Sequence, residues 1–594
     1  MSAAIAIVGM ACRFPGAENL NRYWQMIREG RHKFGTPPAD RWDHSAFFST
    51  SVRTVDRYYA PHGAFLDDVA SFAAMEFGIP PRRVEVMDPQ QRLALECAWY
   101  ALQDAGYAAA IDRVDGGRPI DRKRVGTFLG LCAMEFRSIL GTRTIAQMLA
   151  AGQFGDAADE AEAARIGDMI NRLVPSRAFS GPGVLSNMSA AVVAQELDLG
   201  GPAFTVDAAC ASALVAVHDA VTYLRAGTVD AALAGGVYVN LTPEHLVGFS
   251  RIGAISPGGI CRPFDINADG FVQGEGVGFV MLKRLSDAVR DGDRAYAVIQ
   301  GSALNNDGKG DGPMSPTVDG QAAVIDISWK DAGISARDIT FCETHGTGTT
   351  VGDRTELAAL KSKLAGRDTP VWIGSAKANV GHTMSAAGIA GLIKAVLTVH
   401  HKEIPPLANW TAPHPDIASA PEAFAVPTSA MAWADERRVA TVSSFGFGGT
   451  NAHLVLENAP ASKPTRLLGL GSFTAPKLGQ AELIVLSADD GNLLGRHAQE
   501  LADTVSETDS LAFVAHTLNV GRKRRAVRAA IVATSTADLL RHLRKVAESL
   551  GKDASARGSL GRDIIVGDSA TPVPVAFLCP GQGMQKVGLL REWL

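Results

Sequence analysis

The chain has 594 residues, of which 46% are hydrophobic and 20% charged. This balance excludes a mostly disordered protein and provides for a large core. The 57 Lys and Arg residues are matched by 62 Asp and Glu residues, so the net charge is −5, and bulk charge gives no attraction to nucleic acid or to a membrane. No apolar run reaches the ~18 residues that a bilayer span needs. At ~150 residues per domain, and because α/β folds often run longer, the length predicts two or three domains.

The seven cysteines are widely spaced and form no Cys-x-x-Cys pair. This spacing predicts neither a zinc site nor a disulfide framework, and we expect no bound metal. Thiols without partners favour a reducing compartment, hence the cytoplasm. Residues 1–11 are apolar but carry no basic leader and no cleavage site, so they indicate a buried strand at 5–8 rather than a targeting segment.

Short apolar runs alternate with helical patterns up to about residue 457. This alternation predicts α/β layers. An alanine-rich, acidic helix at 159–171 is expected to face solvent and is assigned no chemistry. Further strands are predicted at 125–131, 231–237, 297–301, 339–342, 371–374 and 440–444, and helices at 90–105, 211–226, 321–331, 355–364 and 386–400.

The composition changes after residue 457. Prolines and small polar residues predict a linker at 458–479. A second, small α/β unit follows, and the stretch 551–571 is expected to be flexible. A final strand at 573–578 runs into a Pro-Gly-Gln-Gly turn, which suggests the opening of a further domain that is cut short. The small unit is predicted to hold strands at 483–487 and 529–533 and helices at 493–505, 511–519 and 537–550.

Two segments resemble ligand-binding motifs but do not match them. Residues 265–270 resemble the first half of a calcium loop, but the twelfth position is Gly276, and Glu275 misses it by one. The glycines at 274–278 do not form a dinucleotide fingerprint, because no strand–turn–helix pattern places them as one. The sequence also contains no phosphate-binding loop and no His-Glu-x-x-His pair.

Cys210 stands where an extended run meets a strongly apolar helix. At a helix N-terminus, free N–H groups and the helix dipole favour the thiolate, which is the reactive form of cysteine. Small neighbours, among them Ala209 and Ala211, would let a substrate carbonyl reach the sulfur. A buried structural cysteine explains the same segment equally well, so the segment alone does not choose between the two.

His345 and His382 each lie in a glycine-containing loop directly after a predicted strand, where α/β active sites gather. A lone histidine of this kind is usually structural, but two histidines with Lys377 and Cys210 favour a site. The spacing of Cys210 and His345 also lies in the range of papain-like peptidases. The local signature of those peptidases is absent, which argues against a cysteine hydrolase.

Four further motifs, in the same order along the chain, resemble the ketosynthase region of modular or iterative type I polyketide synthases, and the resemblance spans residues 3–457. Residues 480–550 are similar to the linker domain that joins ketosynthase to acyltransferase in these synthases, and residues 577–583 resemble an acyltransferase opening. The motifs are IAIVGMACRFPG at 5–16, MDPQQRL at 87–93, RPFD with ADG and GEG at 262–276, and SSFGFGGTNAH at 443–453.

The resemblance implies a thiolase-like five-layer αβαβα fold of two similar halves, usually a homodimer, with a small α/β linker domain. We therefore expect a ketosynthase domain at 1–457, a linker at 458–479, a ketosynthase–acyltransferase linker domain at 480–571, and the truncated start of an acyltransferase at 572–594. That last fragment lacks the nucleophilic serine of an acyltransferase, so no transferase activity is expected from it.

The same resemblance implies an acyltransferase that performs a decarboxylative Claisen condensation and extends a polyketide or lipid-like chain. Cys210 would take the acyl chain from the phosphopantetheine of an acyl carrier protein. No cofactor is bound by the chain itself. The backbone N–H groups of Cys210 and Phe447 would form the oxyanion hole, with Gly448 allowing close approach, and Phe447 would also gate the pocket.

His345 and His382 would hold the malonyl carbonyl and stabilise the enolate, each donor contributing about 3 kcal/mol. Lys377 would support His345 through Glu343 or a neighbour. The resemblance further assigns substrate binding to three polar residues, Thr347, Thr349 and Asn379.

The sequence departs from the family pattern at several positions. Ala208 and Ala211 stand where Thr and Ser are usual, Arg354-Thr355 replaces Pro-Ile, and Ala378 replaces Thr. In these departures the sequence is more similar to iterative, lipid-type synthases. A non-elongating or chain-transferring ketosynthase is the alternative function, but such proteins often lack the cysteine or one histidine, and here all three are present.

Overall fold

The structure is a computed structural model, and it describes residues 3–51, 54–107, 120–156, 159–173, 177–310, 312, 314–460, 481–520, 522 and 524–568. It divides into two compact units, and the described residues up to 460 belong to the first, while 481–568 belong to the second. Most of the expected linker and the whole expected acyltransferase start at 572–594 lie outside the described residues.

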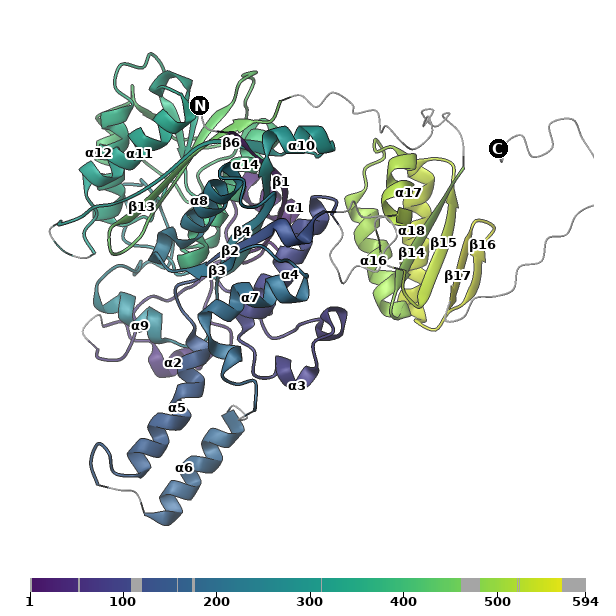
Figure 1. The fold of residues 1–594 in the computed structure, drawn as a ribbon, viewed down its shortest axis with the longest axis horizontal. Coiled ribbons are helices and arrows are strands. Elements are labelled where there is room, and N and C mark those ends of the chain that lie inside the picture. The colour runs from purple at the N-terminus through teal and green to yellow at the C-terminus, as the bar shows by residue number, and fades with distance from the viewer. Residues whose placement is uncertain are drawn as a thin grey trace, which may run out of the picture. The chain divides into compact units, whose positions relative to one another are not determined.

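The first unit is built on one sheet with two halves of the same topology (Figure 1). The spatial order is β3-β2-β4-β5-β1 in one half and β8-β7-β12-β13-β6 in the other, with β10 at the far edge. The strands are β1 (Ile5–Arg13), β2 (Val125–Gly130), β3 (Ala203–Val206), β4 (Ala231–Tyr238), β5 (Gly276–Arg284), β6 (Ala297–Asn306), β7 (Phe341–Glu343), β8 (Val371–Gly374), β10 (Phe424–Ala425), β12 (Val439–Phe445) and β13 (Thr450–Asn458).

The strand directions repeat as well as the order. In each half the first three strands in the spatial order run parallel, and the fourth runs antiparallel to its two neighbours. The halves join where β1 pairs antiparallel with β6, with Ile5 opposite Ile299. Neither β5 nor β13 is predicted from the sequence, because these antiparallel strands follow glycine-rich loops and not the helix that marks a parallel strand.

Helices fill the spaces around and between the halves, so that five layers result. Helices α4 (Pro89–Asp104) and α7 (Ser186–Glu196) pack on the first half, and α11 (Val318–Ala332), with α12 (Thr350–Lys363) against it, packs on the second. Helices α8 (Ser212–Arg225) and α14 (Ala387–His401) contact each other in the middle layer. Residues 387–399 of α14 are all buried, as expected of a helix covered on every side.

One buried ion pair lies in this middle layer. Lys394 of α14 is 2.8 Å from Glu343 at the end of β7, and both side chains are excluded from solvent. A charge buried this deeply needs its partner, because removing one member leaves an uncompensated charge. The pair therefore fixes α14 against the second half of the sheet.

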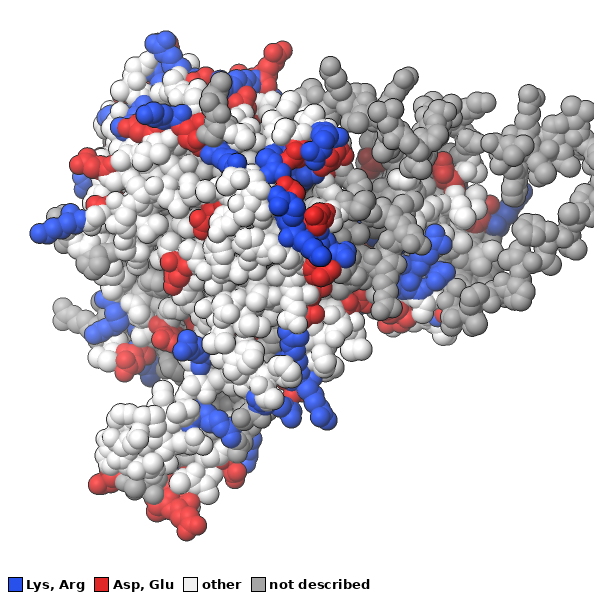
Figure 2. Space-filling model, viewed as in Figure 1, with Lys and Arg blue, Asp and Glu red and all other residues white. Residues whose placement is uncertain are grey.

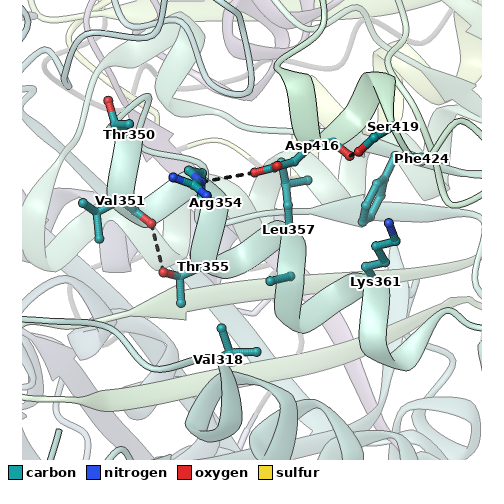
Figure 3. A pocket seen from close by; sticks show the side chains of 11 residues that line it. Val318, Thr350, Val351, Arg354, Thr355, Leu357, Lys361, Asp416, Ser419 and Phe424 are labelled. Carbon is teal, nitrogen blue, oxygen red and sulfur yellow. Dashed lines mark hydrogen bonds and ion pairs between the residues drawn. The ribbon is translucent and has the colours of Figure 1, made fainter. Parts of the chain in front are cut away.

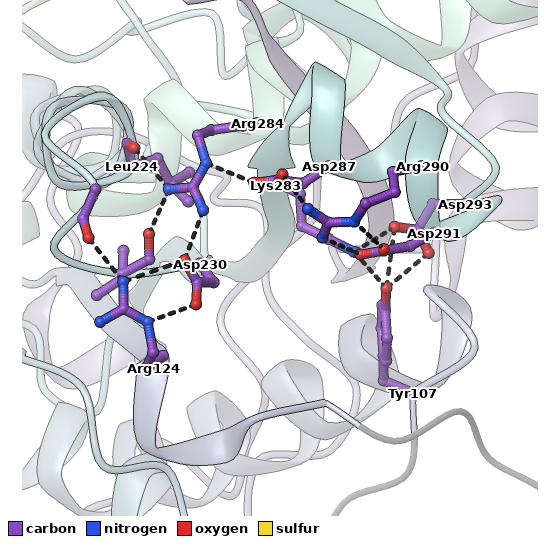
Figure 4. Close-up of polar contacts among 12 residues, drawn as sticks. Tyr107, Arg124, Leu224, Asp230, Lys283, Arg284, Asp287, Arg290, Asp291 and Asp293 are labelled. Atoms are coloured by element: carbon purple, nitrogen blue, oxygen red, sulfur yellow. Dashed lines mark hydrogen bonds and ion pairs between the residues drawn. The ribbon is translucent and has the colours of Figure 1, made fainter.

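Hydrogen bonds and ion pairs of charged side chains also stabilise the end of β5 (Figure 4). Arg284 donates to Asp230 at 2.6 Å and to the carbonyls of Leu224 and Val229. The neighbouring Lys283 points to the opposite side, where its ammonium lies 2.6 Å from an Asp293 carboxylate oxygen. These contacts join β5 to the end of α8 and to the segment before β4.

Among the described residues, no helix is both long enough and apolar enough to span a bilayer. Shorter elements complete the first unit. They are α1 (Leu20–Arg28), α2 (His44–Phe47), α3 (Pro81–Val84), α5 (Glu135–Ala150), α6 (Glu160–Leu173), α9 (Glu244–Arg251), α10 (Leu285–Asp291), α13 (Lys377–Val380), α15 (Pro415–Ala418), β9 (Glu403–Ile404), β11 (Met431–Ala432), and the 3-10 turns η1 (Ala74–Phe77), η2 (Arg122–Arg124), η3 (Pro182–Val184), η4 (Ala209–Ala211), η5 (Ala336–Asp338) and η6 (Met384–Ala386).

The second unit is an antiparallel sheet with helices packed on it. The strand order is β14-β15-β17-β16, and α16 and α18 pack on each other and on the sheet. The stretch 551–571, expected to be flexible, instead holds β16 and β17, because short strands bounded by glycines show little alternation. The elements are β14 (Glu482–Ala488), α16 (Gly491–Thr504), α17 (Leu511–Val520), β15 (Val527–Ala533), α18 (Thr536–Lys552), β16 (Gly558–Gly561) and β17 (Ile564–Asp568).

Candidate active site

Cys210 lies in a tight turn between β3 and α8. The turn, η4, places Ala209 at φ +49°, a left-handed conformation that non-glycine residues rarely adopt. Ser212 stabilises the turn, because its hydroxyl accepts from the Ala208 N–H at 2.9 Å and donates to the Ala209 carbonyl at 2.6 Å. The predicted position of Cys210 at a helix start is therefore found.

The expected thiolate is not found. Burial raises the pKa of Cys210 to about 12, and the nearby Cys132 thiol raises it further, while Lys377 and the backbone N–H groups of Phe447 and Cys210 lower it. The residue is only 8% exposed. A helix dipole contributes about 0.3–1 kcal/mol, less than the ~1.4 kcal/mol that shifts a pKa by one unit. The dipole therefore does not offset burial, and the raised pKa favours the neutral thiol at rest.

The loop between β12 and β13 brings Phe447 to the sulfur. Ser444 donates its hydroxyl proton to the Cys210 carbonyl at 2.7 Å, and two residues later a Cβ on Gly446 would lie 2.3 Å from the Ala208 carbonyl oxygen. Only glycine fits such an approach. Gly448 follows with φ +92°. Phe447 is 41% exposed, and its gating role stays a prediction.

His345 is held in the loop after β7 by a carboxylate from α12. Glu356 accepts the N–H of His345 at 2.7 Å and that of Gly346 at 2.8 Å. The His345 Nδ1 atom accepts from the Phe445 N–H at 3.4 Å and faces the Lys377 ammonium at 3.4 Å. Burial and the positive charge of Lys377 hold the pKa of His345 well below its usual range. A neutral ring that accepts at Nδ1 carries its proton at Nε2.

His382 follows α13 and lies beside His345. The two rings are 5.6 Å apart between centroids and nearly perpendicular, at 84°. The N–H of Met384 donates to Nδ1 of His382 at 3.2 Å, so this ring also carries its proton at Nε2. Burial, and then Lys377, hold the pKa of His382 well below its usual range. The site thus contains two adjacent neutral imidazoles that donate from Nε2.

Lys377 touches His345 directly. Its ammonium donates to the His345 carbonyl at 2.5 Å, and the side chain is buried. The support was expected to run through Glu343 or a neighbour. Glu343 accepts from the Ala376 N–H at 2.5 Å and pairs with Lys394, so the contact between Lys377 and His345 does not need it. The carboxylate that holds His345 is Glu356, 11 residues further along the chain. Glu356 was not predicted as a site residue, although it lies on a predicted helix.

The three residues expected to bind substrate have structural contacts. Thr347 and Thr349 share a hydroxyl hydrogen bond of 2.8 Å, and Thr349 caps α12 by accepting the Gly352 N–H at 3.2 Å. Asn379 is fully buried and donates its amide to the Arg31 carbonyl at 2.8 Å. These contacts position loops, and contact with substrate stays a prediction for all three.

Arg354, one of the departures from the family pattern, lines a cavity of about 460 Å³ between α12 and α15 (Figure 3). Its guanidinium lies 3.4 Å from Asp416. The adjacent Asp353 and the nearby Glu356 point inward and accept the N–H groups of the 345–348 loop. The departure therefore changes the surface of α12 and leaves the carboxylates that hold His345 in place. Within the described residues, no group of three His, Cys, Asp or Glu side chains could hold a metal ion.

Comparison with known families gives three matches along the chain. The model of the β-ketoacyl synthase N-terminal domain matches residues 2–288, that of the β-ketoacyl synthase C-terminal domain matches 296–411, and that of the ketoacyl-synthetase C-terminal extension matches 413–532. Together the matches run through the five-layer unit into the second unit.

Similar proteins are polyketide synthase components of mycobacteria. The chain is 37% identical over 597 residues to one phenolphthiocerol/phthiocerol polyketide synthase polypeptide of Mycobacterium tuberculosis H37Rv, covering 99% of this chain and 35% of that protein. It is 36% identical over 600 residues to a second polypeptide of the same synthase, covering 99% and 29%. The chain thus spans about a third of the length of the curated relatives it matches.

Solved structures agree with the sequence matches. The ketosynthase from module 6 of the bacillaene synthase of Bacillus subtilis 168 superposes with a TM-score of 0.75 at 33% identity, covering 95% of this chain and 87% of that one. An oxazolomycin ketosynthase domain of Streptomyces albus JA3453 gives a TM-score of 0.77 at 30% identity, covering 99% and 93%. The thiolase-like fold is confirmed, and the chain belongs to the β-ketoacyl synthase family, as a relative of the ketosynthase regions of type I polyketide synthases.

Proposed function

We propose that the chain catalyses the decarboxylative Claisen condensation of an acyl-Cys210 intermediate with a malonyl-type thioester carried by an acyl carrier protein. The observation that carries this proposal is a pair of adjacent neutral imidazoles, each with its proton at Nε2. They share the electrostatic influence of Lys377 with the Cys210 thiol, which two backbone N–H groups face. Donors aimed at a developing oxyanion are the main catalytic device for such acyl chemistry.

In the first half-reaction, the Cys210 sulfur attacks the acyl thioester carbonyl. A carbon–sulfur bond to Cys210 forms, the bond to the phosphopantetheine sulfur breaks, and the proton lost by Cys210 ends on the released phosphopantetheine thiol. The N–H groups of Cys210 and Phe447 stabilise the tetrahedral oxyanion. The high pKa of Cys210 fits this step, because sulfur then loses its proton only as the new bond forms.

In the second half-reaction, the carbon–carbon bond to the malonyl carboxylate breaks and CO2 leaves. The electron pair of that bond stays on the thioester fragment and forms an enolate. His345 and His382 donate to the enolate oxygen from Nε2. The enolate carbon then attacks the acyl carbonyl, the bond to Cys210 breaks, and the thiolate takes up a proton from solvent. The product is a β-ketoacyl thioester on the carrier protein. Burial, together with the charge of Lys377, keeps both imidazoles neutral.

The reaction implies partners but no cofactor bound by the chain itself. Phosphopantetheine arrives on the acyl carrier protein, and we propose that two copies of the chain assemble in the cytoplasm. The roles of Thr347, Thr349 and Asn379 in holding the phosphopantetheine belong to the same proposal.

The test is intact-mass analysis after incubation with an acyl thioester, followed by malonyl carrier protein. We expect one acyl adduct on the wild type, none on Cys210→Ala, and an unchanged adduct on Cys132→Ala, which removes the neighbouring thiol. An acyl adduct on Cys210→Ala would exclude Cys210 as the nucleophile. Acylation without any decarboxylation of malonyl carrier protein would favour a chain-transferring ketosynthase instead.

A further inference from the structure

Basic and acidic side chains lie intermixed on the face that Figure 2 shows. Among the described residues of this face there is no extended patch of one sign, of the kind that attracts charged partners over a distance. A group of polar side chains lies instead inside the five-layer unit. It consists of Glu135, Tyr238, His245 and Gln273, and it reaches the segment that holds His382.

His382 is held by residues 272–274, which lie directly before β5. The N–H of His382 donates to the Val272 carbonyl at 2.6 Å, and the N–H of Gly274 donates to the His382 carbonyl at 2.8 Å. Gln273 and His382 are thus paired as in a parallel sheet. Paired residues project to the same side of two strands, so the Gln273 side chain leaves the backbone beside that of His382.

The ring of Phe271 supports this arrangement. Phe271 precedes Gln273 by two residues and therefore lies on the same side of the strand. Its ring packs against the His382 ring at 5.1 Å between centroids and at 66°. Gln273 is 2% exposed and His382 3%. Because buried side chains are closely packed, a shift of this strand is transmitted to the imidazole.

The amide of Gln273 is anchored to β4. It donates from Nε2 to the Tyr238 hydroxyl at 2.6 Å, and that hydroxyl lies 2.9 Å from Nδ1 of His245. The same His245 nitrogen lies 2.6 Å from Oε1 of Glu135. The other Glu135 oxygen accepts the two N–H groups of residues 241–242 at 2.6 and 2.7 Å. A continuous polar chain therefore connects Gln273 to the start of α5 and to the segment between β4 and α9.

One amide atom of Gln273 has no partner. Its Oε1 is buried and forms no hydrogen bond with any described residue. A buried acceptor without a donor destabilises a fold, and an apolar side chain of similar length would avoid this loss. Stability alone therefore does not account for a glutamine at this position, and the contact of its Nε2 with Tyr238 is the feature that needs a function.

We propose that Gln273 is a positioning residue for His382, and that its hydrogen bond to Tyr238 holds the imidazole where the enolate forms. This inference rests on the condensation proposed above and names a residue on which its second half-reaction depends. Gln273 acts through the paired backbone and the packed rings, without contact to the substrate. Without the Tyr238 contact, residues 271–274 lose their side-chain anchor to β4, and His382 moves with them.

The two half-reactions should respond differently. The Cys210 turn is held by Ser212 and Ser444, and among the described residues no hydrogen bond joins that turn to Gln273 or Tyr238. Loss of the Gln273 contact should therefore slow decarboxylation of malonyl carrier protein and leave acylation of Cys210 unchanged.

The experiment measures both half-reactions in Gln273→Leu and Tyr238→Phe, which remove the same hydrogen bond from its two sides. We expect kcat for decarboxylation to fall about ten- to hundredfold in each, with KM and Cys210 acylation unchanged. The double variant should lose no more than either single variant, because the contact is already gone. Tyr296→Phe removes another buried tyrosine hydroxyl, which bonds to Asp104 at 3.0 Å, and is the matched control with unchanged rates.

A spectroscopic measurement separates the positioning role from the reaction. The full chain is labelled with histidine that carries ¹³C at Cε1, and His382→Gln identifies the NMR signal of His382. We expect Gln273→Leu and Tyr238→Phe to shift this signal and Tyr296→Phe to leave it in place.

Four outcomes would overturn the proposal. They are an unshifted His382 signal in both variants, an unchanged kcat in both, equal losses of acylation and decarboxylation, and additive losses in the double variant. A wild type that acylates Cys210 without decarboxylating malonyl carrier protein would refute the proposed reaction. If the His382 signal still shifts in both variants, the positioning role of Gln273 stands.

Discussion

The main-chain N–H of Met384 donates to Nδ1 of His382 at 3.2 Å. Met384 has φ +45°, a left-handed conformation that turns this N–H toward the ring. The contact sets the tautomer of His382, since a neutral imidazole that accepts at Nδ1 must donate at Nε2. The backbone thereby decides which nitrogen of the histidine carries the proton.

This tautomer predicts the outcome of two substitutions at His382. In His382→Gln the side-chain amide can place a donor near the position of Nε2, whereas His382→Ala removes the donor. We expect decarboxylation of malonyl carrier protein to fall by about 10²–10³-fold in the alanine variant and by less in the glutamine variant. Intact mass should still show acylated Cys210 in both. Equal activity of the two variants would contradict the donor role.

The raised pKa of Cys210 predicts a pH dependence for its alkylation. With a pKa of about 12, the thiolate fraction rises about tenfold per pH unit throughout the range from about 7 to 10. The iodoacetamide rate at the Cys210 peptide should therefore rise without levelling. A free cysteine peptide, with a pKa of about 8.5, levels off within that range and is the control. A plateau near pH ~8 at Cys210 would show that the sulfur is held as a thiolate after all.

Gly446 is predicted to tolerate no side chain. A Cβ there would lie 2.3 Å from the Ala208 carbonyl oxygen, in the turn that presents Cys210. We expect Gly446→Ala to displace this turn and to slow Cys210 acylation at least tenfold, with a lower thermal midpoint. Gly248→Ala, in α9 with nothing within 4 Å of the added carbon, is the control. Normal acylation of Cys210 in Gly446→Ala would show that residue 446 does not lie this close to the Ala208 carbonyl.

Asp353 is predicted to contribute stability in a pH-dependent way. It accepts the N–H groups of Phe264, Thr347 and Gly348, and Asp353→Asn would leave one buried N–H facing an amide nitrogen, a loss of about 1–3 kcal/mol. Burial raises the pKa of Asp353 to about 6, from about 3.9 when unfolded.

The direction of the Asp353 pKa shift determines how its contribution to stability changes with pH. A group whose pKa is higher in the folded state than in the unfolded state stabilises the fold most at a pH below its unfolded-state pKa. This stabilisation is lost as the pH rises through its folded-state pKa. The gap in unfolding free energy between wild type and Asp353→Asn should therefore narrow from about pH 4 to about pH 7 in urea titrations. A gap that widens over this range would contradict the assigned pKa.

The motifs predicted that Cys210, His345 and His382 lie in the connections after strands, and they do, after β3, β7 and β8. His382 does not follow its strand directly, as expected, because the short helix α13 lies between them, and four residues are too few to show a helical period in the sequence. The favoured thiolate was not predicted with the right sign, because burial, which raises the pKa of Cys210, outweighs the lowering by Lys377 and by the Phe447 N–H, and local sequence does not show how deeply the turn is buried. Glu356 was missed for a related reason, because a carboxylate in a helix shows its function only when its N–H partners are known.

The repeated topology of the five-layer unit has a consequence for how its chemistry is divided. The Cys210 turn follows β3 and opens α8, and the segment with Lys377 and His382 follows β8 and leads into α14. By strand order these are equivalent places in the two halves. In the proposed reaction, the first half therefore holds the acyl group on Cys210 and the second half supplies donors to the enolate, so equivalent places in the two halves contribute the two reactants of one carbon–carbon bond.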